Sequence, residues 1–216
     1  MKNNSIYKNK EMRYKTMDIE QIINDMENEG NVAGYQYFSL LKKRIILFND
    51  ECNDSIVEKV GMPLLAFDKD SNNAPIHLYI SSEGGSTFSS LYLCDIIDNY
   101  SKPLYIHIMG YALSMGFLLA CAGANNPNVH KDCYPFSIFM MHAGSISLSG
   151  NAANARRFME FEKKLEDKTK KYVLTHTNMT EETYDKYNDD DYWMTAEEAL
   201  EYGVIDKIIG GGDCEK

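Results

Sequence analysis

Apolar residues occur along this chain in two arrangements, short continuous runs and stretches with helical spacing, and the two alternate. The continuous runs predict buried strands, the second of them running into a glycine turn, at 44–48, 74–85, 104–110, 136–142 and 204–209. The helical spacing predicts helices at 86–100, 114–123, 152–177 and 195–203. The polar segment 144–150, bounded by glycines, has the pattern of one more strand. Apolar strands that alternate with helices favour an α/β fold with a mainly parallel sheet.

The helix expected at about 152–177 is amphipathic. Phe158, Phe161, Leu165 and Tyr172 follow helical spacing, and the remaining faces are charged, as in "EFEKKLEDKTKK". An apolar stripe of this kind has to be buried against another surface. We therefore expect this helix to pack on the body of the protein or on a partner.

The two ends of the chain differ from its middle. Residues 1–36 are polar and carry charges of both signs, with the pattern of a short helix only at 17–30. We expect residues 1–36 to be a flexible or partner-docking arm and 211–216 to be a tail. One domain over 37–210 is in keeping with a chain of 216 residues.

Composition excludes several classes of function. The formal net charge is −10 and no Lys/Arg-rich patch is present, so we expect no nucleic-acid partner. The five cysteines are scattered without a CxxC pair, which favours reduced thiols over disulfides or a zinc site. The first 21 residues lack the apolar stretch of a signal peptide. These features predict a cytoplasmic protein.

One segment has the composition of a membrane span. Residues 104–124 carry no formal charge and are long enough to cross a bilayer. However, they contain His107, Ser114 and several glycines, and Pro103 precedes them. A buried strand, a tight turn and a buried helix explain the segment better, so we expect no membrane association.

Ser114 stands out because it is the one aliphatic hydroxyl in the apolar run "GYALSMGFLLACAG". A buried hydroxyl without a partner costs roughly 1–3 kcal/mol, so a hydrogen bond to a carbonyl or a helix cap is one interpretation. The other interpretation is a nucleophile at a strand-to-helix turn. Acyl transfer by serine then needs an imidazole, a carboxylate and N–H donors for the oxyanion.

Five histidines are candidates for the imidazole. His142 ends a predicted strand, where side chains of an α/β sheet reach the ligand crevice, and is the best candidate base. His77 and His107 lie inside strands, which is typical of hydrogen-bonded core residues. His130 is expected in a polar loop and His176 near a helix end.

The carboxylate and the N–H donors have several candidates. Asp189, Asp190 and Asp191 form a run before an aromatic pair, and such a run is usually a solvated loop. The turn "SSEGGS" offers the backbone N–H groups of Gly84 and Gly85, which suit an oxyanion and equally a phosphate.

Five segments in this order resemble the proteolytic subunit of the Clp protease (the ClpP family) over about residues 38–209. They are "LLKKRIILF", "IHLYISSEGGSTFSSLYLCDII", "GYALSMGFLLACAGA", "FMMHAGS" and "DYWMTAEEALEYGVIDKII". The resemblance implies a crotonase-like α/β fold with repeated β-β-α units and a protruding handle helix at about 152–177. It implies a serine endopeptidase that needs no cofactor or metal. Its implied catalytic residues are Ser114, His142 and Asp191, with the backbone N–H groups of Gly85 and Met115 as the oxyanion hole.

The resemblance also implies partners. Similar proteins form homo-oligomers of two stacked heptameric rings with the active sites inside. A Clp-type AAA+ ATPase feeds them unfolded polypeptides, which they cut to short peptides.

Several positions depart from the family pattern and leave alternatives open. Glu83 replaces a usual proline, Tyr111 and Leu113 replace small residues, and the segment 124–133 is longer than usual. The arm at 1–36 does not match the family's axial loop. A phage head-maturation protease of the same fold is therefore an alternative, as is a non-catalytic ring or assembly subunit. An acyl-CoA enzyme of the crotonase fold is less favoured because it needs no serine nucleophile.

Overall fold

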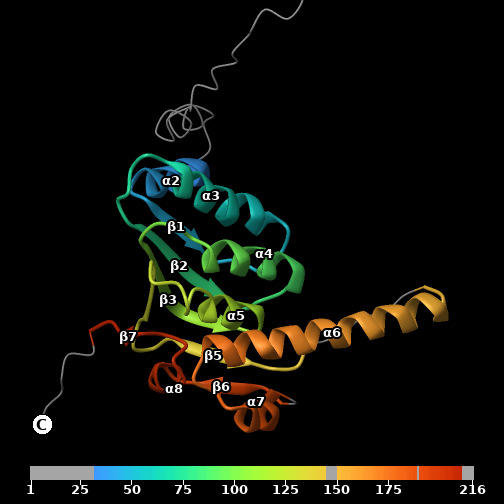
Figure 1. Cartoon of the computed structure of the whole chain (residues 1–216). Coiled ribbons are helices and arrows are strands. Elements are labelled where there is room, and N and C mark those ends of the chain that lie inside the picture. Colours follow the sequence, from blue (N-terminus) through green and yellow to red (C-terminus); the bar gives the residue numbers. More distant parts are fainter. Residues whose placement is uncertain (1–31, 145–149, 189, 211–216) are drawn as a thin grey trace, which may run out of the picture.

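A largely parallel sheet forms the centre of the protein, as the alternation of strands and helices predicts (Figure 1). The computed structural model describes residues 32–144, 150–188 and 190–210. Five strands follow one another as parallel neighbours in the order β1 (Ile45–Phe48), β2 (Ile76–Ser82), β3 (Leu104–Leu113), β4 (Val129–Cys133) and β7 (Lys207–Ile208). Each crossover between parallel strands requires a long connection, which the helices supply.

The sheet branches at β3. The first half of β3 pairs with β4, whereas its second half pairs with β5 (Ile138–Met141), again in parallel. The last strand, β6 (Tyr192–Met194), then pairs with β5 in the antiparallel sense. The branch therefore carries the ends of β3, β5 and β6 to one place.

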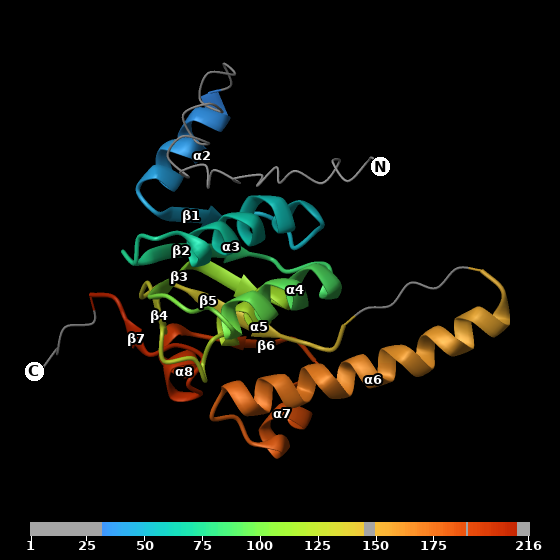
Figure 2. The ribbon, with the colours of Figure 1, turned by 45° about the horizontal axis from the view of Figure 1, so that its top comes forward.

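Helices cover one face of the sheet and extend from its lower end. Helices α3, α4 and α5 lie in a row along this face (Figures 1 and 2). Helices α6, α7 and α8, from the second half of the chain, lie beyond α5 at the end of the sheet that contains β5 and β6. Their bounds are α2 (Val32–Lys42), the π-helical segment η1 (Val57–Gly61), α3 (Met62–Lys69), α4 (Thr87–Asp98), α5 (Met115–Cys121), α6 (Ala152–His176), α7 (Glu181–Asn188) and α8 (Ala196–Glu201). Thr195 caps α8 in a reciprocal capping box with Glu198, as the Thr-x-x-Glu spacing predicts.

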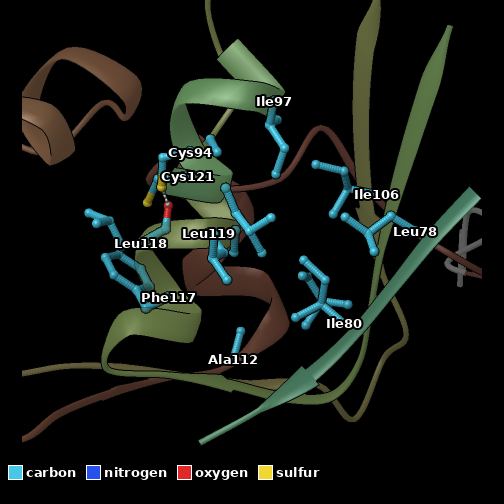
Figure 3. Close-up of a cluster of buried hydrophobic side chains, with 14 of the residues drawn as sticks. Leu78, Ile80, Cys94, Ile97, Ile106, Ala112, Phe117, Leu118, Leu119 and Cys121 are labelled. Atoms are coloured by element: carbon cyan, nitrogen blue, oxygen red, sulfur yellow. Dashed lines mark hydrogen bonds between the residues drawn. The ribbon is translucent and has the colours of Figure 1, made fainter. Parts of the chain in front are cut away.

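The core lies between β2 and β3 on one side and α4 and α5 on the other. Alternate residues of β2 are fully buried, in keeping with a strand that has one face against helices. Figure 3 shows the side chains that fill this space, among them Leu78, Ile80, Ile97, Ile106 and Leu119. Helix α5 is buried along almost its whole length, which explains why its sequence is apolar on every side.

Helix α6 extends far beyond the body, as the resemblance to handle-bearing proteins implies (Figure 2). Val173 is its one buried residue within the described chain. In its outer part, Phe158, Met159 and Phe161 are exposed, and the ring of Phe161 lies 6.5 Å from that of Phe88 on α4. The outer half of the predicted apolar stripe, Phe158 and Phe161, is therefore exposed in the single chain.

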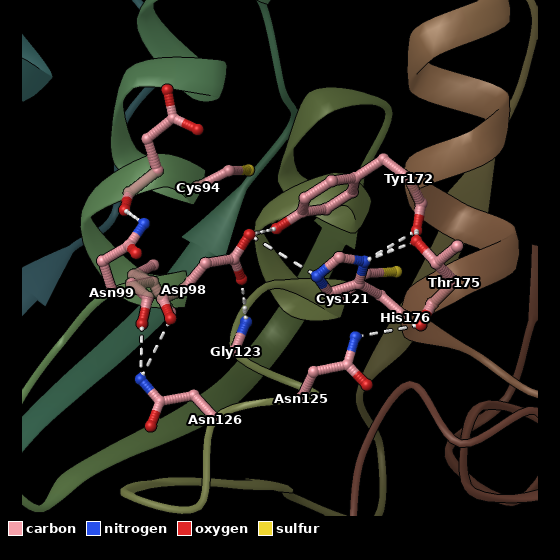
Figure 4. A network of polar contacts seen from close by, with 12 residues as sticks. Cys94, Asp98, Asn99, Cys121, Gly123, Asn125, Asn126, Tyr172, Thr175 and His176 are labelled. Carbon is pink, nitrogen blue, oxygen red and sulfur yellow. Dashed lines mark hydrogen bonds and ion pairs between the residues drawn. The ribbon is translucent and has the colours of Figure 1, made fainter.

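The base of α6 is tied to α4 by a polar network (Figure 4). The Asp98 carboxylate accepts hydrogen bonds from the Tyr172 hydroxyl at 2.8 Å and from the Gly123 N–H at 2.7 Å. The Nε2 atom of His176 lies 3.5 Å from the same carboxylate. This network fixes the direction in which α6 leaves the body.

Several expectations need correction or lie outside the described residues. His130 belongs to β4, not to a polar loop, and the strand before Ser114 continues to Leu113 rather than ending at Gly110. The sequence patterns also did not predict η1, α3, α7 or β6. Most of the strand expected at 144–150 lies outside the described residues, as do the arm up to residue 31 and the tail. The last residues of the expected arm belong to α2.

The apolar segment at 104–124 forms β3 and α5, which confirms the interpretation as strand, turn and helix. None of the helices in the described ranges is both long enough and apolar enough to cross a bilayer.

Candidate active site

Ser114 occupies the turn between β3 and α5. Its backbone has a positive φ of 53° with ψ at −119°, a conformation that costs a non-glycine residue roughly 1–3 kcal/mol. The surrounding backbone holds it there, because Ser114 N donates to Met140 O at 2.8 Å and Ser114 O accepts from Phe117 N at 3.0 Å. Strain of this kind is found where a side chain has to be presented at a sharp turn.

Two glycines make this turn possible. A Cβ atom on Gly84 would lie 2.8 Å from Ser114 Cβ and 2.7 Å from Met115 N. A Cβ atom on Gly116 would lie 2.7 Å from Ser82 O. The end of β2 and the Ser114 turn therefore pack so closely that neither position admits a side chain.

His142 directly follows β5 and contacts Ser114. Its Nε2 atom lies 2.9 Å from Ser114 Oγ. The pairing of Leu113 with Met140 in the β3–β5 ladder brings the two strand ends together. Ser114, expected at a strand-to-helix turn, and His142, expected at a strand end, thus meet because the sheet branches at β3.

Asp191 lies on the other side of the imidazole. It directly precedes β6, whose Tyr192 pairs with Met141 on β5, and its Oδ1 atom lies 3.2 Å from His142 Nδ1. In the tautomer with its proton on Nδ1, His142 would present a donor to this carboxylate and leave Nε2 to accept from the Ser114 hydroxyl. The side chains of His142 and Asp191 are 31% and 56% exposed, so water reaches this pair in the single subunit.

The N–H of Gly85 faces away from the neighbouring chain segment. Cys52 and Gly85 form a parallel β-bridge in which Cys52 N donates to Gly84 O and Ser86 N donates to Cys52 O. In such a bridge the N–H of the central residue points to the opposite side of the strand. Here that side is the one on which β3 runs and ends in the Ser114 turn.

Met115 supplies a second N–H group beside the hydroxyl. It is the first residue of α5, and the N–H of a first helical residue has no acceptor within the helix. The backbone groups of Gly85 and Met115 thus flank Ser114 from the loop after β2 and from α5. Sequence reasoning named both, and named Gly84 as a further N–H donor rather than for its close packing against this turn. It missed Ser82, which packs against Gly116.

The other histidines are held in contacts away from Ser114. His77 Nδ1 lies 2.9 Å from His107 Nε2, and His107 Nδ1 lies 2.5 Å from Asp132 Oδ1. Burial, followed by the neighbouring His107, lowers the pKa of His77. These contacts confirm the interpretation of His77 and His107 as hydrogen-bonded residues of the sheet.

No cluster of three or more His, Cys, Asp or Glu side chains with metal-binding geometry occurs among residues 32–144, 150–188 and 190–210. The four cysteines in this part of the chain are free and buried. Burial raises the pKa of Cys94 and Cys121, to about 12 for the latter. These two thiols are therefore protonated at neutral pH.

A hydroxyl, an imidazole and a carboxylate in this order and at these distances form the arrangement that serine hydrolases use for acyl transfer. Comparison with known proteins then places the chain more closely. The family model described as "Clp protease" matches residues 28–211, which is most of the sequence. The chain therefore belongs to the Clp protease family, a family of peptidases, as its sequence motifs imply.

Proposed function

We propose that this protein is a serine endopeptidase that cleaves unfolded polypeptide chains, with Ser114 as nucleophile, His142 as general base and Asp191 as the residue that orients His142. The single observation that carries the proposal is the contact of 2.9 Å between His142 Nε2 and Ser114 Oγ, with Asp191 on the opposite ring nitrogen. No structural role requires these three groups to meet at a strained turn.

The geometry supports the following reaction. His142 Nε2 takes the proton of Ser114 as Oγ attacks the carbonyl carbon of the scissile peptide. The carbonyl oxygen becomes an oxyanion and receives hydrogen bonds from the N–H groups of Gly85 and Met115. The protonated His142 then donates to the leaving amine nitrogen. A water molecule, deprotonated by His142, hydrolyses the acyl-enzyme and restores Ser114.

Assembly is the second part of the proposal. Phe158, Met159 and Phe161 on α6 are exposed in the single subunit, although such side chains favour burial. We infer a homo-oligomer in which a second subunit covers this stripe, in the form of two stacked heptameric rings as in similar proteins. A Clp-type AAA+ ATPase would deliver unfolded chains to a chamber of this kind in the cytoplasm. Family membership and the exposed stripe support this part.

Labelling with a fluorophosphonate tests the catalytic assignment. The full-length protein should be labelled at Ser114, as read by mass spectrometry, and should hydrolyse an unstructured fluorogenic peptide. Ser114→Ala should lose both properties, with a fall in hydrolysis on the order of 10⁴-fold or more, because the triad acts as a unit. An alanine variant that still cleaves at the original rate would show that Ser114 is not the nucleophile. A wild-type protein that neither reacts nor cleaves would favour a non-catalytic ring subunit.

A further inference from the structure

The direction of the Gly85 N–H depends on how the peptide between Gly84 and Gly85 is held. Gly84 O accepts from Cys52 N at 2.7 Å. In a planar trans peptide the C=O and the following N–H point in opposite directions. The hydrogen bond to Cys52 therefore turns the Gly85 N–H toward the Ser114 side.

The peptide between Gly84 and Gly85 can rotate easily, because both of its flanking residues are glycines. Gly84 and Gly85 have φ values of 92° and 134°, and glycine adopts such conformations and their alternatives with little steric cost. A flip of the peptide would present a carbonyl oxygen to Ser114 instead of a donor. Something other than local sterics has to keep the peptide in place.

The hydrogen bond from Cys52 N holds this peptide directly, and Ser82 holds the peptide that precedes it. Its Oγ atom lies 2.7 Å from Asp50 O and 3.2 Å from Gly84 N. A carbonyl oxygen only accepts, so the hydroxyl donates to Asp50 O and accepts from Gly84 N. One hydroxyl thus fixes the peptide before Gly84 and joins it to the segment that contains Cys52.

Ser82 is a polar residue in a buried position. It is only 1% exposed, at the end of β2, on the face that packs against Gly116. Its further contact is with the buried thiol of Cys52, whose Sγ lies 3.6 Å from Oγ. Ser82 therefore links two chain segments, residues 50–52 and the turn at Gly84 and Gly85. We call this group of contacts the loop brace.

We propose that Ser82 is a positioning residue for the oxyanion hole, which it keeps formed by bracing the turn at Gly84 and Gly85 against residues 50–52. This inference rests on the proposed serine peptidase function. It goes beyond the triad because Ser82 acts through the Gly85 N–H and touches no reacting atom.

Steady-state hydrolysis of an unstructured peptide by the full-length protein tests the brace. Ser82→Ala leaves Asp50 O and Gly84 N without their partner, so the turn that carries the Gly85 donor is held by the Cys52 hydrogen bond alone and the donor is less well fixed. We expect kcat to fall about 10- to 100-fold, up to the effect of losing one oxyanion donor, while KM stays within about twofold. A peptide boronic acid should bind more weakly by a similar factor, since its tetrahedral oxygen occupies the same hole.

A matched control variant and a second variant of Ser82 complete the test. Ser81→Ala makes the same substitution one residue away, on the opposite face of β2, and should leave kcat within about twofold of wild type. If Ser82→Ala does not fold, as judged by circular dichroism, Ser82→Cys preserves the shape with a weaker donor and should lower kcat in the same way.

The outcomes separate the two proposals. A wild-type protein that cleaves through Ser114, together with a folded Ser82→Ala variant of unchanged kcat, overturns the brace and leaves the proposed function intact. A loss of activity that matches the loss of folded protein, with normal kcat in the remainder, also overturns it. A wild-type protein that never reacts at Ser114 overturns both.

Discussion

Met140 O accepts a hydrogen bond from Ser114 N at 2.8 Å, so the strand that carries His142 also holds the backbone of the residue that His142 contacts. The distance between imidazole and hydroxyl is thereby set by the ladder between β3 and β5 rather than by a loop. Sites built on strands keep their geometry better than sites on loops. The carboxylate is held in a similar way, because β6 pairs with the same strand.

The choice among the three aspartates is the first prediction. Asp191→Asn should lower kcat on the order of 10³- to 10⁴-fold, because an amide can donate to His142 Nδ1 and so favour the wrong tautomer. Asp190→Asn is the matched control and should change kcat by less than about threefold, since an exposed charge contributes little. Steady-state peptide hydrolysis measures both. Equal effects of the two variants would contradict the assignment.

The second prediction concerns the close packing at Gly84. Gly84→Ala places a methyl group within 2.8 Å of Ser114 Cβ at a residue with φ of 92°, so the turn has to move. We expect loss of fluorophosphonate labelling and a lower melting temperature, because steric and conformational strain add. Gly144→Ala is the control, since nothing lies within 4 Å of its added Cβ and its φ is not positive. A Gly84→Ala variant that labels normally would show that the turn tolerates displacement.

The third prediction concerns the outer part of α6. Replacing both Phe161 and Leu165 with Glu should split the proposed assembly into single rings or smaller species, because charge in a buried apolar contact is costly. Light scattering measures the particle mass. Lys164→Glu and Lys168→Glu, made together, alter exposed charged positions and should leave the mass unchanged. A Phe161/Leu165 variant of full mass would mean that the stripe does not lie at a subunit contact.

The fourth prediction concerns the arm that precedes α2. Deletion of residues 1–31 should abolish degradation of a tagged folded substrate in the presence of a Clp-type ATPase and ATP, and should leave hydrolysis of short peptides intact or raised. The reason is that a closed chamber admits a folded protein only after unfolding, whereas a short peptide enters alone. Rapid cleavage of a folded substrate by the full-length protein without ATPase would instead favour the head-maturation protease.

The sequence predicted those parts of the fold in which apolar periodicity is strong. The strands at 44–48, 74–85 and 136–142 and the long helix from residue 152 are all found close to their predicted positions. Strand β4 was missed because Lys131 and Asp132 interrupt its apolar pattern. Both side chains are nevertheless buried. Their polar groups have partners there, because Lys131 Nζ donates to Cys121 O at 3.2 Å and Asp132 contacts His107. A charged residue whose partners are provided only by the folded structure has the same sequence pattern as a residue of a solvent-exposed loop.

The candidate site was predictable to a similar extent. The glycines around Ser114 and the end of the strand at His142 are visible as local patterns, and the structure brings both residues together. The family motif was needed to choose Asp191, because three successive aspartates are equivalent by local pattern. The brace at Ser82 could not be predicted, since it depends on Asp50, more than thirty residues earlier in the chain, lying beside the turn.

The branching of the sheet at β3 has a consequence for how this chain tolerates insertions. β5 holds its own register on β3 through Tyr111–Ile138 and the two pairs that follow, whatever precedes it. Extra residues between α5 and β4 would therefore be accommodated in the loop at 122–128. They do not displace His142. The number of residues in this loop can therefore change during evolution without a compensating substitution near Ser114.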